Sequence, residues 1–190
     1  MNSHNPLDPV YKAYAVASDC FRVVTRAIRN PSKELIDRTH FDAIDPATVD
    51  TAVDIAAQQA ADLAVLALFA TFERFVIEHL QMANRLLAAG YPQQYSAKLA
   101  QKFENEVEYW KFGEVLNLFK GEVDPDLIGQ VKQVKQYRDW IAHRNPKQPP
   151  AAVSNPEMAY DVLTRTIEQI QQTHMPTAEV MQDVAPALVE

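Results

Sequence analysis

The stretch from Asp45 to Gly90 constrains the fold more than any other part of this chain. After Pro46 it contains no glycine or proline until Gly90. Asp45-Pro46 is a helix-start signal, and Gly90 with Pro92 just beyond it is a helix-stop signal. About 44 residues at about 1.5 Å each would make a rod about 65 Å long, so we expect one long helix with a kink or a late start.

The middle of this predicted helix, from Leu63 to Ile77, is apolar nearly all the way round. A helix of that kind is packed on all sides, so we expect this segment at the centre of the molecule. Glu73 interrupts the apolar run, and a buried carboxylate is costly unless it is paired. Two alternatives stay open for Glu73: an ion pair across the bundle with Arg138, or an exposed pair with a cation on its own helix.

Shorter helical patterns flank the long one on both sides in the sequence. Each combines apolar residues at steps of three and four with start or stop signals. The predicted helices run from Pro9 to Arg29, from Gln93 to Lys120 with a division at Gly113, from Pro125 into the stretch 138–146, and from Pro156 to Thr173, and a helical turn is expected at 33–37. The fold class is therefore predicted to be all-α: a single-domain antiparallel helical bundle over residues 1–173, with one long central helix and a flexible tail over 174–190.

Composition narrows the class of protein. The 190 residues are 47% hydrophobic, which suits one globular domain, and the net charge of −7 argues against a surface that coats nucleic acid or anionic membrane throughout. The single cysteine, Cys20, excludes a disulfide framework, and the first residues lack the features of a signal peptide. The longest charge-free apolar stretch, 63–72, is about half of the roughly 20 residues that a membrane span needs. We expect a cytoplasmic protein without membrane contact.

Most familiar catalytic signatures are absent. The sequence has no glycine-rich phosphate loop, no His-Glu-x-x-His pair and no cysteine pair, so no metal or other cofactor is expected. Cys20 could serve a Cys–His enzyme, but a lone cysteine in a helical stripe is more often a small core residue.

The helix that begins at Pro125 carries the strongest candidate site. One line of residues at steps of three and four is apolar except for Arg138, and the neighbouring line, which includes Asp139 and His143, is wholly polar. Asp139 and His143 are four residues apart, so the carboxylate can reach the imidazole. A cation in an apolar line, beside an Asp–His pair, makes the end of this helix a candidate site.

The stretch Arg138-Asp139-Trp140-Ile141-Ala142-His143 resembles the motif of the HEPN domain family, which carries an arginine, a polar residue and a histidine a few positions further on. Asn145 just after it, and Phe72-Glu73-Arg74-Phe75 in the long helix, add to the likeness, which covers residues 10–173. Arg74 and His79 have the same spacing as Arg138 and His143. They lie in the middle of a helix, and we interpret them as ordinary helix surface.

The resemblance implies a metal-independent endoribonuclease, often a toxin or antiviral defence effector, that works as a homodimer with both motifs facing a shared cleft. His143 would act on the ribose 2′-hydroxyl or the leaving oxygen, Arg138 would hold the scissile phosphate, and Asp139 would orient one of them. Glu73 and Asn145 would support these residues. On an ideal helix Arg138 and His143 point about 140° apart, so their convergence requires the reach of the arginine, a distorted helix end or a second subunit.

Charge is distributed unevenly around this motif. From Gly129 to Gln148 there is one carboxylate, Asp139, against five cations, Lys132, Lys135, Arg138, Arg144 and Lys147. Five minus one gives +4 in a chain whose total is −7, which leaves −11 elsewhere. Lys132, Lys135, Arg144 and Lys147 are therefore candidate RNA contacts. The alternative is a solvated helix face whose cations complement the helix dipole.

Partners and an alternative function follow from the same residues. RNA is the expected ligand, and an antitoxin or another regulatory protein stays open as a partner. Family toxins that partner a nucleotidyltransferase often carry a tyrosine two residues after the histidine, where this chain has Asn145, so the resemblance does not extend to that partner. The alternative function is a catalytically inactive HEPN-like module that binds nucleotides or proteins, because arginine and histidine bind nucleotides as readily as they cleave RNA.

Overall fold

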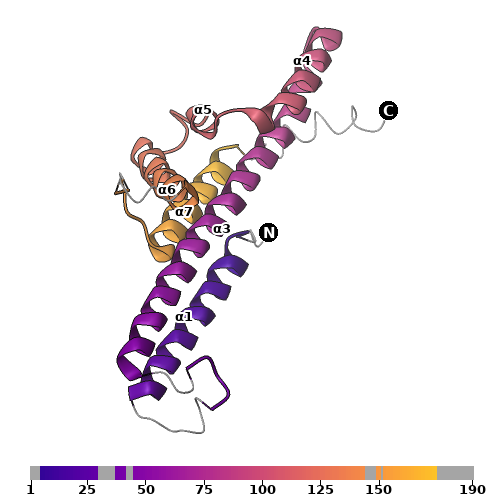
Figure 1. Cartoon of the computed structure of the whole chain (residues 1–190). Helices are drawn as coiled ribbons and strands as arrows, with labels where there is room; N and C mark the ends of the chain where they lie inside the picture. Colours follow the sequence, from indigo (N-terminus) through magenta and orange to yellow (C-terminus); the bar gives the residue numbers. More distant parts are fainter. Residues whose placement is uncertain (1–4, 30–36, 42–44, 144–148, 151, 175–190) are drawn as a thin grey trace.

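The computed structural model describes residues 5–29, 37–41, 45–143, 149, 150 and 152–174. These residues form helices and no β-strand, which confirms the all-α prediction (Figure 1). In chain order the elements are α1 (Asp8–Arg29), α3 (Pro46–Ala88), α4 (Gln93–Glu106), the short 3-10 helix η1 (Val107–Tyr109), α5 (Phe112–Asn117), α6 (Pro125–His143) and α7 (Pro156–His174). No helix in this part of the chain combines the length and apolar character that a membrane crossing requires. The expected turn at 33–37 and the expected tail lie almost wholly outside the described residues.

The helix α3 is the axis of the molecule. It is one continuous helix of 43 residues that begins at Pro46, so the expected late start is wrong. Asp45 caps it, because its carboxylate accepts the Ala47 N–H at 2.9 Å and also the Thr48 hydroxyl. Other helices cover successive parts of its length: α1 the first half, α6 and α7 the middle, and α4 the C-terminal end (Figure 1). This continuous packing stabilises a helix that is too long to be supported by one neighbour.

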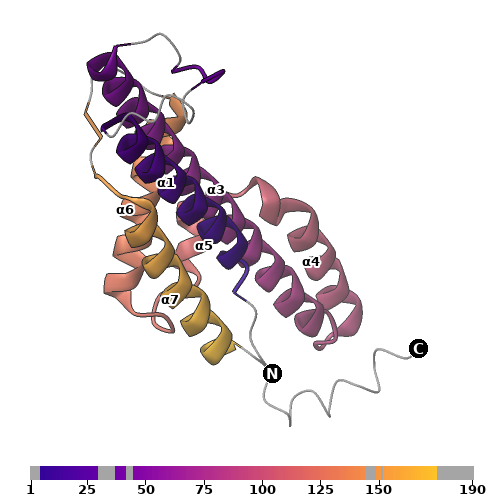
Figure 2. The same cartoon turned by 90° about the horizontal axis from the view of Figure 1, so that it is seen from below.

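The main core lies between α3, α6 and α7. Figures 1 and 2 show α6 and α7 together on one side of α3, with α4 on the other side. The largest side chains of this core are fully buried and include Phe69, Phe72, Leu116, Phe119 and Leu163. A second, smaller cluster of Ile28, Val49 and Val53 joins α1 to the start of α3. The core therefore sits in the half of α3 that carries the candidate site.

The apolar segment 63–77 of α3 is buried on one side only. Phe69 and Phe72 are fully buried, whereas Leu63 is 64% exposed, and Ala67 and Ala70 are exposed as well. The prediction that this segment is packed all the way round is therefore wrong. The reason is that α1, α6 and α7 contact the remaining sides of α3, and none of the described elements covers the side of Leu63.

The chain turns before α5 at Trp110 and Lys111, and the division expected at Gly113 is wrong. Trp110 has an extended backbone (φ −71°, ψ 147°), and its ring centroid lies 5.3 Å from that of Phe103. Gly113 lies inside α5, and apart from its chain neighbours and the backbone of its own helix no described atom is within 4 Å of the position that a Cβ would occupy. The turn therefore lies beside the Trp110–Phe103 contact and not at Gly113.

Candidate functional site

Arg138 lies on the side of α6 that packs against α3. The guanidinium carbon is 5.6 Å from the centroid of the buried Phe69 ring, and the side chain is 31% exposed. The arginine stem therefore covers apolar surface while its charged end reaches solvent. The other residues of its line are buried, as their spacing predicts: Leu127, Val131, Val134 and Ile141.

Two carboxylates from different helices hold the guanidinium. Nη2 of Arg138 lies 3.5 Å from Oε2 of Glu73 on α3, and Nη1 donates to Oδ1 of Asp139 on α6 at 3.0 Å. The predicted pairing of Glu73 with Arg138 across the bundle is therefore present. The pair is half-buried rather than buried, since the Glu73 side chain is 30% exposed.

Asp139 uses both carboxylate oxygens on cations of its own helix. Its Oδ2 accepts a hydrogen bond from Nζ of Lys135 at 2.5 Å, and its Oδ1 accepts from Arg138. Partial burial raises the pKa of Asp139, but the hydrogen bonds from Lys135 and Arg138 lower it further, and the net pKa lies below the usual value. The expected Asp139–His143 pair is not formed in the described structure, where both carboxylate oxygens of Asp139 face Lys135 and Arg138 instead.

His143 is the last residue of α6, and its side chain is exposed. Because α6 stays helical up to this residue, no distortion of the helix before His143 brings it toward Arg138. The ideal separation of about 140° then leaves the reach of the arginine or a second subunit as routes to convergence. Arg144, Asn145 and Lys147, which the sequence places beside the motif, lie outside the described residues.

Two of the described cations of α6 are paired with carboxylates in the fold. Lys135 is paired with Asp139, and Arg138 is shared between Asp139 and Glu73. Lys132 donates to Oδ1 of Asn117 at 3.3 Å. Among the described residues, the three cations Lys132, Lys135 and Arg138 minus Asp139 give +2, and Glu73, which reaches the strip from α3, lowers the sum to +1. The other two positive charges of the sequence count, on Arg144 and Lys147, lie outside the described residues.

A buried polar contact beneath the motif was missed from the sequence. Asp62 of α3 is 5% exposed, and it accepts hydrogen bonds from the Tyr137 hydroxyl at 3.0 Å and from Nε2 of Gln58 at 2.9 Å. Because Tyr137 directly precedes Arg138, this contact ties the same turn of α6 to α3. The sequence contained a signal for this contact. One line of α3 runs through Asp62, Leu66, Phe69 and Glu73 at steps of four, three and four, so Asp62 lies on the same side of the helix as Glu73.

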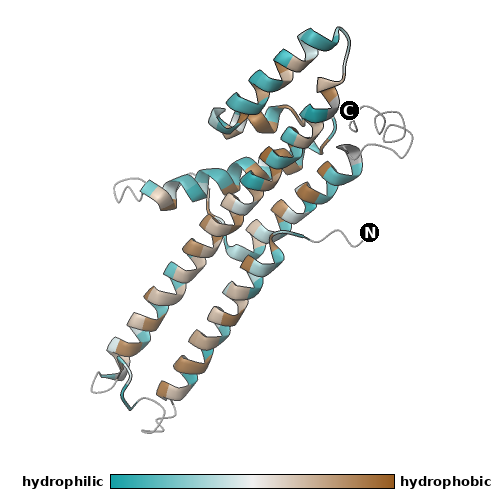
Figure 3. Ribbon diagram, turned by 90° about the vertical axis from the view of Figure 1, so that its right-hand side faces the viewer, coloured by the Kyte–Doolittle hydropathy of each residue, from teal (hydrophilic) through white to brown (hydrophobic). Residues whose placement is uncertain are grey.

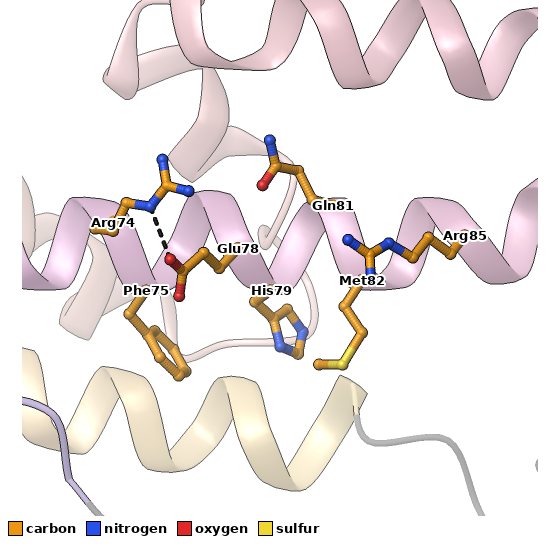
Figure 4. A pocket seen from close by; sticks show the side chains of 7 residues that line it. All are labelled: Arg74, Phe75, Glu78, His79, Gln81, Met82 and Arg85. Carbon is orange, nitrogen blue, oxygen red and sulfur yellow. Dashed lines mark hydrogen bonds and ion pairs between the residues drawn. The ribbon is translucent and has the colours of Figure 1, made fainter.

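Arg74 and His79 lie in unlike surroundings. Arg74 is exposed and pairs with Glu78 at 2.8 Å and with Glu108 at 3.0 Å. His79 is 7% exposed, and its ring lies 6.4 Å from that of Phe119. The interpretation of His79 as helix surface is therefore wrong, because the core reaches this side of α3. Figure 4 shows both residues beside a surface pocket of about 500 Å³ along α3, with Phe75, Glu78, Gln81, Met82 and Arg85.

The described residues contain no group of three or more His, Cys, Asp or Glu side chains arranged to hold a metal ion. No protein-family model, curated protein or solved structure matches the chain. The contacts of Arg138 with Glu73 and of Tyr137 with Asp62, between α6 and α3, define the candidate site.

Proposed function

We propose that the protein is a metal-independent endoribonuclease of HEPN type, in which Arg138 and His143 act on one phosphodiester bond of RNA. The observation that supports it most is the position of Arg138, which Glu73 and Asp139 hold from two helices with its guanidinium partly exposed. His143 is exposed at the end of the same helix. A guanidinium that is already oriented offers its remaining donors to a phosphate without reorganising on binding.

In the proposed reaction the ribose 2′-oxygen attacks the adjacent phosphorus, and the bond from phosphorus to the 5′-oxygen breaks. The products are a 2′,3′-cyclic phosphate and a 5′-hydroxyl. His143 takes the proton of the 2′-hydroxyl or gives one to the leaving 5′-oxygen, and water exchanges the other proton. Arg138 binds the non-bridging phosphate oxygens as their charge increases. Glu73 and Asp139 act as positioning residues for Arg138.

The family resemblance supplies the setting of this proposal. The protein acts in the cytoplasm as a homodimer whose two motifs share a cleft, as a toxin or antiviral defence effector. Neighbouring phosphates of the RNA contact Lys132, Lys135, Arg144 and Lys147, and Asn145 supports the catalytic residues. Because Arg138 and His143 of one straight helix point apart, Arg138 of one subunit acts together with His143 of the other. An antitoxin or another regulatory protein restrains the activity.

The second candidate is an HEPN-like module without nuclease activity that binds nucleotides or another protein. The observation that favours it is the pairing of Lys135 with Asp139 and of Arg138 with Asp139 and Glu73. Cations that already pair with carboxylates attract a polyanion less strongly. In this alternative Arg138 mainly links α6 to α3.

Incubation of total RNA with the purified protein in EDTA tests the proposal. The wild type should cleave, and His143→Ala should lower the rate by about 10²–10⁴-fold. The matched control is His40→Ala, which removes another exposed histidine and should keep the wild-type rate. Equal cleavage by wild type and His143→Ala would contradict the proposed role of His143. Equal inactivity, with nucleotide binding that depends on Arg138, would favour the second candidate.

A further inference from the structure

Trp140 is the aromatic residue of α6 that lies nearest His143. The two residues are three positions apart, so they lie about 60° apart round the helix and nearly one turn apart along it. The indole is half-buried, because it packs against the main core with one part and reaches solvent with another. Figure 3 shows α6 crossing α3 and extending to one side of it, so a long ligand can approach the end of the helix that carries both residues.

The direction of the indole is set by Tyr137. The two ring centroids are 5.9 Å apart and the ring planes differ by 17°, so the rings are nearly parallel. Tyr137 is itself fixed to α3, because its hydroxyl donates to the buried Asp62 at 3.0 Å. Since Tyr137 precedes Trp140 by nearly one turn, it lies on the side of the indole toward the start of α6, and the opposite side is directed toward His143. A ring that is already oriented loses little side-chain freedom when it binds a ligand.

The side of α6 around Trp140 carries amide side chains. Gln133 and Gln136 are exposed and lie within about 40° of Trp140 round the helix. The helix has two carboxylates. Asp126 shares this side but lies in the first turn, about 21 Å away along the axis, and Asp139 lies about 100° round and pairs with cations. Amides that donate and accept hydrogen bonds, beside an aromatic ring, suit the edges and the face of a nucleobase.

We propose that Trp140 determines base specificity: its indole stacks on the base of the nucleotide whose 2′-hydroxyl faces His143. The inference rests on the proposed ribonuclease function. The base is bonded to C1′ of the ribose, and the 2′-hydroxyl is bonded to the adjacent C2′. A ribose at His143 therefore places its base within reach of a ring that lies nearly one turn earlier on the same side. Because a purine offers a larger face for stacking than a pyrimidine, the nucleotide before the cleaved bond is preferentially adenosine or guanosine.

Fluorescence of Trp140 tests the stacking directly, since Trp110 is the only other tryptophan of the chain. The protein for this experiment combines His143→Ala, which slows cleavage, with Trp110→Phe, which leaves Trp140 as the only emitter. A short oligoadenylate RNA should quench the emission, because a stacked base contacts the indole. An abasic RNA with the same number of phosphates should leave the emission unchanged. Equal quenching by both RNAs would show that Trp140 senses the backbone and not the base, and would overturn the proposal.

Replacement of the ring provides a second readout. In the His143→Ala background, Trp140→Leu should bind the oligoadenylate about 5–150-fold more weakly and the abasic RNA as before, because stacking on an aromatic ring contributes this much per base. Trp140→Phe, which keeps a smaller ring, should fall between the two. Trp110→Leu is the matched control: Trp110 is 37% exposed after η1, and its variant should keep the affinity of the parent. Circular dichroism of each variant checks that the helices are retained. Undiminished binding of the oligoadenylate by Trp140→Leu would overturn the proposal.

Failure of this inference is distinguishable from failure of the proposed function. A wild type that cuts RNA after purines, with a preference that Trp140→Leu loses, would support both. If the wild type cleaves RNA and Trp140→Leu selects the same sites, only the role of Trp140 is overturned. If the oligoadenylate quenches Trp140 but the wild type cleaves no RNA, the stacking stands and the ribonuclease is overturned. An oligoadenylate that does not bind at all would overturn both.

Discussion

Arg138 on α6 and Glu73 on α3 form an ion pair in which Nη2 and Oε2 are 3.5 Å apart. The guanidinium also donates to Asp139 and lies over the Phe69 ring, so groups from two helices fix its direction. Both members of the pair reach solvent, and ion pairs of this exposure contribute little to stability. The main effect of the contact is therefore on the orientation of the arginine.

Replacement of Glu73 tests that orientation. Glu73→Gln should lower the free energy of unfolding by less than about 1 kcal/mol. It should lower the rate of RNA cleavage much more, by about 10–100-fold, because a small displacement of a group that binds the reacting phosphate is costly. Glu78→Gln is the control, since Glu78 pairs with Arg74 on the outer side of the same helix. Cleavage by Glu73→Gln at the wild-type rate would show that the pair has no part in function.

Asp139 gives a prediction for the pH dependence of stability. Partial burial raises the pKa of Asp139, yet the hydrogen bonds from Lys135 and Arg138 lower it further, to a value below the usual one. A carboxylate with a lowered pKa in the folded state stabilises the fold above its unfolded pKa of about 3.9, and this contribution is lost as the pH falls through the folded pKa. Asp139→Asn should therefore be less stable than the wild type at neutral pH, and the difference should shrink below about pH 4. Urea unfolding of both proteins from neutral pH to below about pH 4 measures this difference in stability. A difference that grows as the pH falls would contradict the lowered pKa of Asp139.

The contact of Tyr137 with Asp62 should matter for stability. Tyr137→Phe removes one of the hydrogen bonds to a buried carboxylate, so the free energy of unfolding should fall by about 1–3 kcal/mol. Tyr109→Phe is the matched control, because Tyr109 is 87% exposed and its variant should stay within about 0.5 kcal/mol of the wild type. Chemical denaturation of the wild type, Tyr137→Phe and Tyr109→Phe measures these free energies of unfolding. Equal stability of the two variants would mean that other partners of Asp62 suffice.

The lysines of α6 should differ in their contribution to RNA binding. Lys135 is already paired with Asp139 at 2.5 Å, whereas Lys132 donates a hydrogen bond to Asn117 and has no ion pair within the described part of the chain. In the His143→Ala background, which prevents cleavage, Lys132→Gln should reduce the slope of log K against log salt by about 1. Lys135→Gln should reduce it less. Identical slopes for the two variants and their parent would remove both lysines from the RNA contact.

The helices could be predicted because their start and stop signals are local. Glu73 and Arg138 could be considered as a pair because their charges are opposite. Start signals such as Asp45-Pro46 fix where a helix begins whatever packs against it. Glu73 and Arg138 each interrupt an apolar line, and pairing with one another satisfies both groups. The all-α class therefore followed from residue order, and this contact was one of the two pairings that the sequence left open for Glu73.

The remaining features depend on which helix covers which side of α3. Asp62 is buried and its neighbour Leu63 is exposed, the reverse of their hydropathy, because α6 covers the side of Asp62. Asp139 had two candidate partners at the same spacing, Lys135 and His143, and the structure pairs it with Lys135. Neither outcome could be derived from periodicity alone.

The central claim is that His143 and Arg138 cleave RNA through its own 2′-hydroxyl. The most direct measurement is the identity of the ends that the protein produces in EDTA from a short RNA and from the same RNA with a 2′-deoxy residue at the cleaved position. We predict 2′,3′-cyclic phosphate and 5′-hydroxyl ends from the wild type, no cleavage at the deoxy residue, and cleavage by His143→Ala that is slower by about 10²–10⁴-fold. Cleavage of the deoxy substrate, 3′-hydroxyl ends, or cleavage by His143→Ala at the wild-type rate would contradict the claim.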